Sequence, residues 1–141
     1  MTAHLSPAEI VEAMHAAFRA RDLDNIATYW ADDIHFVAPG VDSVGKDARI
    51  RDEQVWLDAF SENSVDVEWV ISRDDEVVEF CVLGGVHTGD LQQPDGNVLP
   101  PTQRRITGHF TSLYRICEGK VVYQKIIYDR LGLVEQLMGT A

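Results

Sequence analysis

The carboxylate of Asp129 lies where an apolar strand-like run, Ile126 to Tyr128, ends and a short apolar helix is expected to begin. We expect this setting to remove the carboxylate partly from water. Desolvation favours the neutral form of a carboxyl group and suits it to proton transfer. Aspartate is also a favoured N-cap, so the other interpretation is that Asp129 caps the following helix. Taken alone, the position favours the cap.

His87 is the second residue whose position is typical of acid/base chemistry. It ends the strand-like run that starts at Val77, and it lies beside an irregular loop, residues 90–101. We predict that His87 orients a carbonyl group or shares a proton with Asp129, since imidazole titrates near neutral pH. The alternative is that His87 bonds to a neighbouring backbone group and shapes the turn.

The remaining ionisable residues are less distinctive. Glu79 stands in an apolar strand, so its carboxylate must face solvent, a partner or a cavity. His4 and His15 are expected to be exposed, and His35 is expected at the surface or at a rim. No metal site is predicted, because the five histidines show no H-x-H or H-x₃₋₅-H spacing. The sequence has no phosphate loop, dinucleotide fingerprint or serine nucleophile elbow.

Aromatic residues are candidates for the wall of an apolar substrate pocket. Trp30 and Trp56 stand in the predicted helical part, and Tyr114 stands in a predicted strand. A tyrosine hydroxyl can hydrogen-bond an oxyanion, although packing in the core is the more usual role of aromatic residues.

The order of the predicted elements is helices first and long strands afterwards, which indicates an α+β domain. Ser6 to Glu9 form a capping box with proline at the first helical position, and Ile10 and Met14 follow at helical spacing. From Ser64 the hydrophobic period changes to two, which is typical of strands. The other expected elements are a short helix capped by Asp22, a strand Ile34 to Val37, a helix Lys46 to about Phe60, strands Ser64 to the turn at 73–76, Val77 to about His87, about Arg104 to Cys117 and Lys120 to Tyr128, and a helix Leu133 to Met138.

The fold class that these elements predict is a curved antiparallel sheet wrapped around three N-terminal helices, a cone-shaped α+β barrel. Side chains need not fill such a cone, so a small-molecule site is expected inside it. The length of 141 residues fits a single domain, residues 1–141.

The composition restricts the partners. A net charge of −11 repels phosphate backbones and anionic membranes, so neither nucleic acid nor a membrane is expected as a partner.

Cys81 and Cys117 lie in apolar runs and are expected to be reduced core residues of a cytoplasmic protein. No leader and no apolar run long enough to span a membrane is seen. An exposed apolar sheet face is expected to pair two copies into a homodimer or a higher homo-oligomer.

Four motifs in register give the chain a resemblance to a known family. They are Gly85-Val86-His87-Thr88-Gly89, Pro100-Pro101-Thr102-Gln103-Arg104-Arg105, Arg115-Ile116-Cys117-Glu118-Gly119-Lys120-Val121 and Asp129-Arg130-Leu131-Gly132 followed by Gln136-Leu137. They resemble the motifs of SnoaL-like polyketide (ester) cyclases within the nuclear transport factor 2-like superfamily. The match is good from Gly85 to Leu137 and looser over residues 10–60.

The resemblance implies an enzyme of secondary metabolism that closes a ring in a polyketide-like intermediate. It implies that Asp129 is the general acid/base and that no cofactor or metal takes part. Relatives that open epoxides or isomerise ketosteroids, and non-catalytic binding modules, are the alternatives.

The resemblance also suggests which residues contact the substrate. The family's usual histidine aligns with Ser112, which would point inward together with Phe110 and Tyr114 and leave His109 outside. A second polar position aligns with Ile127, or with Gln124 in another register. The polar position of the first strand aligns with Phe36 or Val37. The predicted substrate-binding residues are therefore Ser112, Phe110, Tyr114, Gln124, Ile127, Phe36, Trp56 and Trp30.

Overall fold

The computed structural model describes residues 4–140. Its main feature is a six-stranded sheet in the order β2-β1-β8-β7-β4-β3. The strands of this sheet are β1 (Trp30–Ala38), β2 (Val41–Val44), β3 (Phe60–Arg73), β4 (Glu76–His87), β7 (Arg105–Cys117) and β8 (Lys120–Tyr128). The helices are α1 (Pro7–Arg19), α2 (Leu23–Ala27), α3 (Lys46–Ala59) and α4 (Arg130–Met138).

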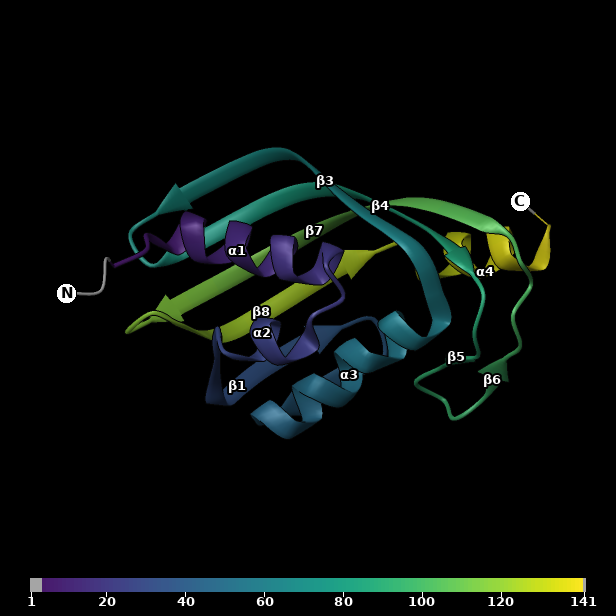
Figure 1. Cartoon of the computed structure of the whole chain (residues 1–141), viewed down its shortest axis with the longest axis horizontal. Coiled ribbons are helices and arrows are strands. Elements are labelled where there is room, and N and C mark those ends of the chain that lie inside the picture. Colours follow the sequence, from purple (N-terminus) through teal and green to yellow (C-terminus); the bar gives the residue numbers. More distant parts are fainter. Residues whose placement is uncertain (1–3, 141) are drawn as a thin grey trace.

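The sheet curves around the helices, as predicted. Helices α1, α2 and α3 lie on one side of the sheet, and α4 follows β8 at the end where the chain finishes (Figure 1). Neighbouring strands are antiparallel except for β1 and β8, which run parallel with Phe36 opposite Gln124. The predicted curved α+β sheet is confirmed, and β1–β8 is the one parallel pair in this otherwise antiparallel sheet.

Three details of the predicted elements are corrected. Strand β2 was not expected, and the loop 90–101 contains a small hairpin of β5 (Leu91–Gln92) and β6 (Val98–Leu99). Strand β3 begins at Phe60 rather than at Ser64. The register shifts between Ser61 and Ser64, where Glu62 has a positive φ of 52°. This bulge interrupts the alternation of apolar and polar residues, so the sequence pattern does not show that the strand continues back to Phe60.

The first helix begins where the capping box predicts. The Ser6 hydroxyl accepts a hydrogen bond from the Glu9 N–H at 3.2 Å, and the Ser6 N–H donates to the Glu9 carboxylate at 2.9 Å. These two bonds satisfy backbone groups that a helix end leaves open. Helix α1 then directs Ile10 and Met14 onto the sheet.

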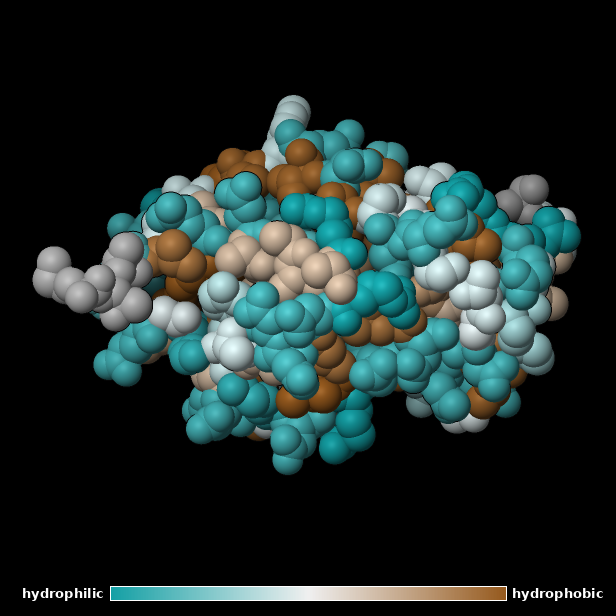
Figure 2. Space-filling model, viewed as in Figure 1, coloured by the Kyte–Doolittle hydropathy of each residue, from teal (hydrophilic) through white to brown (hydrophobic). Residues whose placement is uncertain are grey.

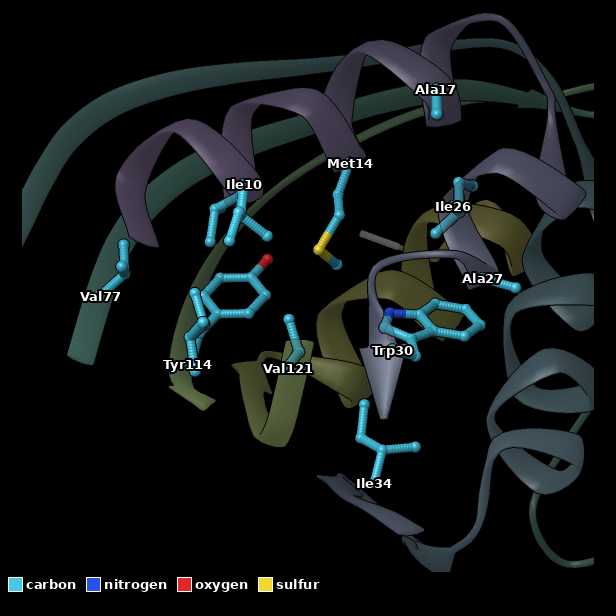
Figure 3. Packing of buried hydrophobic residues seen from close by; sticks show 12 residues of the cluster. Ile10, Met14, Ala17, Ile26, Ala27, Trp30, Ile34, Val77, Tyr114 and Val121 are labelled. Atoms are coloured by element: carbon cyan, nitrogen blue, oxygen red, sulfur yellow. The ribbon is translucent and has the colours of Figure 1, made fainter. Parts of the chain in front are cut away.

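The core consists of two clusters of buried residues. One lies beneath α1 and α2, where Ile10 and Met14 approach Tyr114 and Trp30 (Figure 3). The other lies beneath α4 and includes Ile106 and Leu137. Full burial of a large aliphatic side chain contributes about 1.5–3 kcal/mol, so these clusters fix both helix layers against the sheet.

The helical side is mainly hydrophilic, and hydrophobic residues gather along the edge where β3 runs (Figure 2). Cys81 is a buried free thiol, but Cys117 is exposed, so the prediction that both cysteines lie in the core is wrong for Cys117. No helix among residues 4–140 is long and apolar enough to cross a membrane.

Candidate active site

A cavity of about 570 Å³ lies between the helices and the sheet. It takes residues from both core clusters, and its wall is mainly apolar. Polar residues of several elements also line it, and the ones that bear on chemistry are His15 of α1, Arg49 and Glu53 of α3, Gln124 of β8 and Asp129 at the β8–α4 junction. A cavity of this size with few polar groups is typical of a site for a small, largely apolar molecule.

Side chains alternate between the two faces of β7 and β8, and this alternation decides which strand residues face the cavity. Phe110 pairs with Tyr128 and Tyr114 pairs with Gln124, and all four line the cavity. Ile127 lies between inward-facing neighbours, so it points to the outer face of the sheet and is 58% exposed. The prediction that Ile127 contacts the substrate is therefore wrong.

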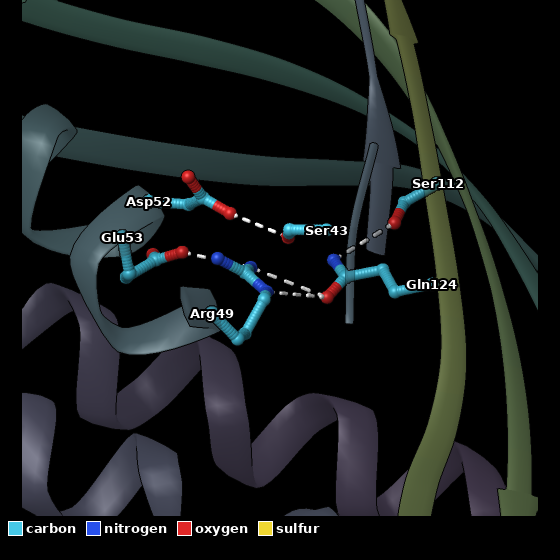
Figure 4. Close-up of polar contacts among 6 residues, drawn as sticks. All are labelled: Ser43, Arg49, Asp52, Glu53, Ser112 and Gln124. Atoms are coloured by element: carbon cyan, nitrogen blue, oxygen red, sulfur yellow. Dashed lines mark hydrogen bonds and ion pairs between the residues drawn. The ribbon is translucent and has the colours of Figure 1, made fainter. Parts of the chain in front are cut away.

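A buried guanidinium lines the cavity. Arg49 of α3 is 3% exposed. It pairs with Glu53 one helical turn later at 2.8 Å and donates to the Gln124 side-chain oxygen at 3.2 Å (Figure 4). The Gln124 amide in turn donates to the Ser112 hydroxyl at 3.3 Å. This chain fixes the orientation of Gln124 and leaves Ser112 behind it, outside the cavity lining.

Aromatic rings cover the guanidinium and form part of the wall. Arg49 lies 4.4 Å from the ring centre of Trp30 and 3.9 Å from that of Phe36. Such cation–π contacts stabilise a desolvated cation. Trp56 stacks on Phe60 at 5.4 Å. The predicted wall residues Trp30, Phe36 and Trp56 all line the cavity.

Asp129 occupies the junction between β8 and α4. It is the N-cap of α4, and its carboxylate accepts a hydrogen bond from the Gly132 N–H at 2.9 Å. It is exposed, so the expectation that it is partly desolvated is wrong. The chain leaves the sheet at Tyr128, and Asp129 therefore stands at the edge of the core rather than within it. It nevertheless lines the cavity, together with Arg130.

His87 is fully buried but does not line the cavity. Its Nδ1 atom accepts a hydrogen bond from the Thr102 N–H at 3.1 Å, and its ring packs against Phe60. The alternative that His87 binds the backbone and shapes the turn is thus confirmed, and its position gives no direct contact with a bound substrate. Because Nδ1 accepts, the proton of the neutral ring lies on Nε2, which is buried without a hydrogen-bond partner among the described residues.

Burial lowers the pKa of His87 from its ordinary value near 6.5. The unfolded chain therefore binds this proton at a higher pH than the folded chain does. The free energy of unfolding should fall as the pH drops below about 6.5, by at most about 1.4 kcal/mol per pH unit, and should level off below the folded pKa. His87→Asn keeps an acceptor for the Thr102 N–H. Urea unfolding between pH 7.5 and 5 should show this extra loss in the wild type and not in His87→Asn; equal slopes would contradict it.

A histidine and a glutamate form a close pair at the inner end of the cavity, beneath α1. His15 of α1 and Glu79 of β4 are both buried, and the His15 Nε2 atom lies 2.7 Å from the Glu79 carboxylate. The expectation that His15 is exposed is wrong, because α1 turns this residue toward the sheet. Burial raises the pKa of the neighbouring Tyr114 phenol, and Glu79 raises it further, so the hydroxyl stays a neutral donor.

The same place holds the one group among residues 4–140 whose spacing would admit a metal ion. Its members are His15, Glu79 and Cys81, whose ligand atoms lie within 4.8 Å of one another. Burial and the nearby carboxylates of Glu79 and Glu68 raise the pKa of the Cys81 thiol to about 12. The thiol is therefore protonated at neutral pH, and a metal ion that bound here would have to displace this proton.

Of the predicted site residues, the structure brings Asp129, Gln124, Tyr114, Phe110, Phe36, Trp56 and Trp30 together around one cavity. It does not bring Ser112, His87 or Ile127 to the cavity surface. Arg49, Glu53 and His15 also line the cavity, although none of them was predicted as a site residue. The i,i+4 spacing of Arg49 and Glu53 was a visible signal, since such pairs meet on one helix face.

A curved sheet closed by helices around an apolar cavity defines a cone-shaped α+β protein of the nuclear transport factor 2-like type. The chain belongs to the SnoaL-like polyketide cyclase family, whose model matches residues 8–137. No curated protein gives a significant match.

Solved structures agree with this assignment. A candidate SnoaL-like polyketide cyclase from Jannaschia sp. CCS1 superposes with a TM-score of 0.83 at 19% identity, over 96% of this chain and 92% of that one. AclR, a candidate hydroxylase from Streptomyces galilaeus, gives 0.80 at 22% identity over 94% and 81%. IdmH, a candidate polyketide cyclase from Streptomyces antibioticus, gives 0.77 at 20% identity over 95% and 99%. At these identities the similarity establishes the fold.

Proposed function

We propose that this protein closes a ring in a small, largely apolar, carbonyl-bearing intermediate of secondary metabolism by acid/base catalysis. The single observation that carries the proposal is the apolar cavity with its few ordered polar groups, within a SnoaL-like fold. A carbon acid flanked by two carbonyl groups needs only a modest base, and a positioned carboxylate can supply it.

In this proposal Asp129 is the base. It reaches the cavity from the β8–α4 junction, and the cap bond to Gly132 fixes its orientation. The carboxylate takes the proton from the carbon between the two carbonyl groups. The exposed position lets the proton leave to water after each turnover.

Arg49 and Gln124 would then orient the substrate's oxygen atoms. The Arg49 guanidinium is held by Glu53 and by two aromatic rings, so it cannot move far when charge develops on the substrate. Fixed donors that point toward a developing oxyanion stabilise it without reorganisation.

A variant that fills the cavity tests whether it is the site. A side chain at Gly108 of β7 would enter the cavity, because a Cβ atom there has no neighbour within 4 Å. Gly108→Phe is expected to weaken binding of the bicyclic ketone 2-tetralone at least tenfold, measured by quenching of Trp30 and Trp56 fluorescence. Ile127→Phe is the matched control, since Ile127 of the neighbouring strand is exposed on the outer face of the sheet and does not line the cavity. Equal binding by both variants would exclude this cavity.

We also propose that the outer sheet face pairs two copies of the chain. Trp69, Phe80, Thr111 and Ile127 form one row across four strands, and Trp69 is 70% exposed. Exposed apolar area of this kind is typical of an interface. Trp69→Lys is expected to shift the mass in solution from that of a dimer to that of a monomer of 15.8 kDa. A wild-type chain that is already monomeric at high concentration would contradict the pairing.

A further inference from the structure

The inner end of the cavity holds an acid/base pair that the proposed function does not use. His15 lines the cavity, whereas Glu79 lies behind it and is only 2% exposed. Their 2.7 Å contact joins α1 to β4, 64 residues apart in the chain. A carboxylate buried in an apolar core is costly unless a donor or a cation compensates it.

The contact determines which nitrogen of His15 faces the substrate. The His15 Nε2 atom is the ring nitrogen in contact with Glu79, so in the proposed arrangement Nε2–H donates to the carboxylate. Nδ1 has no hydrogen-bond partner among residues 4–140, and it is not one of the fully buried atoms without a partner, so it keeps accessible surface. The hydrogen bond at one ring nitrogen thus leaves the other free to exchange a proton.

The groups around the pair suit proton exchange with an oxygen atom. Tyr114 of β7 also lines the cavity and presents a neutral hydroxyl, and the Cys81 thiol of β4 is protonated. The surrounding residues Ile10 and Met14 of α1 are apolar. Hydrogen bonds gain strength where water is excluded in this way.

We propose that His15, positioned by Glu79, exchanges a proton with the carbonyl oxygen of the bound substrate at the inner end of the cavity. This inference rests on the proposed function, because it assigns the second acid/base group of the same site. His15 is then a catalytic residue and Glu79 a positioning residue. The arrangement follows the logic of a carboxylate that orients an imidazole and balances its positive charge.

Asp129 takes a proton from the carbon acid while Nδ1 of the protonated His15 ring gives one to the adjacent carbonyl oxygen, so that an enol forms. The enol carbon then attacks the second carbonyl carbon, whose π electrons move onto its oxygen, and this oxygen gains a proton from water. Asp129 gives its proton to water at the cavity mouth, and the enol hydroxyl returns its proton to Nδ1 of His15, so no proton is gained or lost overall.

The test uses α-hydrogen exchange of 2-tetralone in D₂O, since enolisation needs a base at carbon and an acid at oxygen. His15→Gln can keep the hydrogen bond to Glu79 but cannot transfer a proton. We expect kcat to fall at least tenfold with KM nearly unchanged, in line with the usual contribution of one acid/base group. Glu79→Gln should also lower kcat rather than raise KM. Glu12→Gln, which removes a carboxylate from the exposed face of α1, should leave both constants near the wild-type values.

A spectroscopic measurement gives a reading that does not depend on turnover. 2-Naphthol imitates the enol of 2-tetralone, and its hydroxyl should shift the Nδ1 resonance of His15 in ¹⁵N NMR, whereas naphthalene should not. If His15→Gln exchanges 2-tetralone at the wild-type rate while Asp129→Asn does not, the inference about His15 fails and the proposed function stands. An Nδ1 resonance that ignores 2-naphthol would also overturn the inference. Failure of the wild type to exchange 2-tetralone would instead count against the proposed function.

Discussion

Asp129→Asn is expected to lower the rate of 2-tetralone hydrogen exchange about 100-fold, at the lower end of what one general base contributes. The amide has nearly the shape of the carboxylate but is not a base. Asparagine is also as good an N-cap as aspartate, so α4 should begin at the same residue. The loss should therefore appear in kcat, while the binding of 2-tetralone stays within a few-fold of the wild-type value.

The cap requires its own control, because the structure shows Asp129 capping α4 and leaves its base role as a proposal. Asp129→Ser keeps a capping oxygen and shortens the side chain. If the serine and asparagine variants both fold like the wild type and both lose exchange, the carboxylate acts in chemistry. Wild-type exchange in either variant would reduce Asp129 to a structural residue.

Arg49→Met is expected to lower the free energy of unfolding by about 3 kcal/mol, because removal of one member of a buried ion pair strands the other. Glu53 would lose its cation and Gln124 would lose a donor. The side chain of Glu53 is 14% exposed, so some water can reach the stranded carboxylate. This places the expected cost at the lower end of the range for buried pairs.

Two further variants separate charge from packing at this position. Arg49→Lys keeps the positive charge but loses the planar fork, so its cost should be intermediate. The double variant Arg49→Met with Glu53→Gln removes the stranded charge and should be more stable than Arg49→Met alone. Urea unfolding at pH 7 measures all three. A loss below about 1 kcal/mol for Arg49→Met would show that the pair contributes little to folding.

The sequence was sufficient for the parts of the fold that depend on local patterns. The capping box at Ser6, the hairpin at Glu118-Gly119 and the alternation of β7 and β8 all act over a few residues, and the structure confirms them. Alternation also places Phe110, Tyr114 and Gln124 on one face. The same alternation counted from Gln124 puts Ile127 on the outer face. Ile127 was wrongly predicted as a substrate contact because the alignment left both Gln124 and Ile127 open for the second polar position.

The parts that the sequence left undetermined depend on contacts between distant segments. His15 and Glu79 are 64 residues apart, and Arg49 and Gln124 are 75 apart. A helical wheel shows that His15 lies near the apolar face, but only the position of α1 on β4 shows that a carboxylate meets it there. The exposure of Asp129 likewise follows from the direction in which the chain leaves the sheet.

The most direct test of the central claim is whether the wild-type protein accelerates hydrogen exchange at the α-carbon of 2-tetralone. We predict saturable exchange well above the buffer rate at pH 7, blocked competitively by 2-naphthol and absent in Gly108→Phe, whose phenyl ring would occupy the cavity. An exchange rate equal to that of buffer, with 2-tetralone shown to be bound, would contradict acid/base catalysis in this cavity and leave a binding module as the better description.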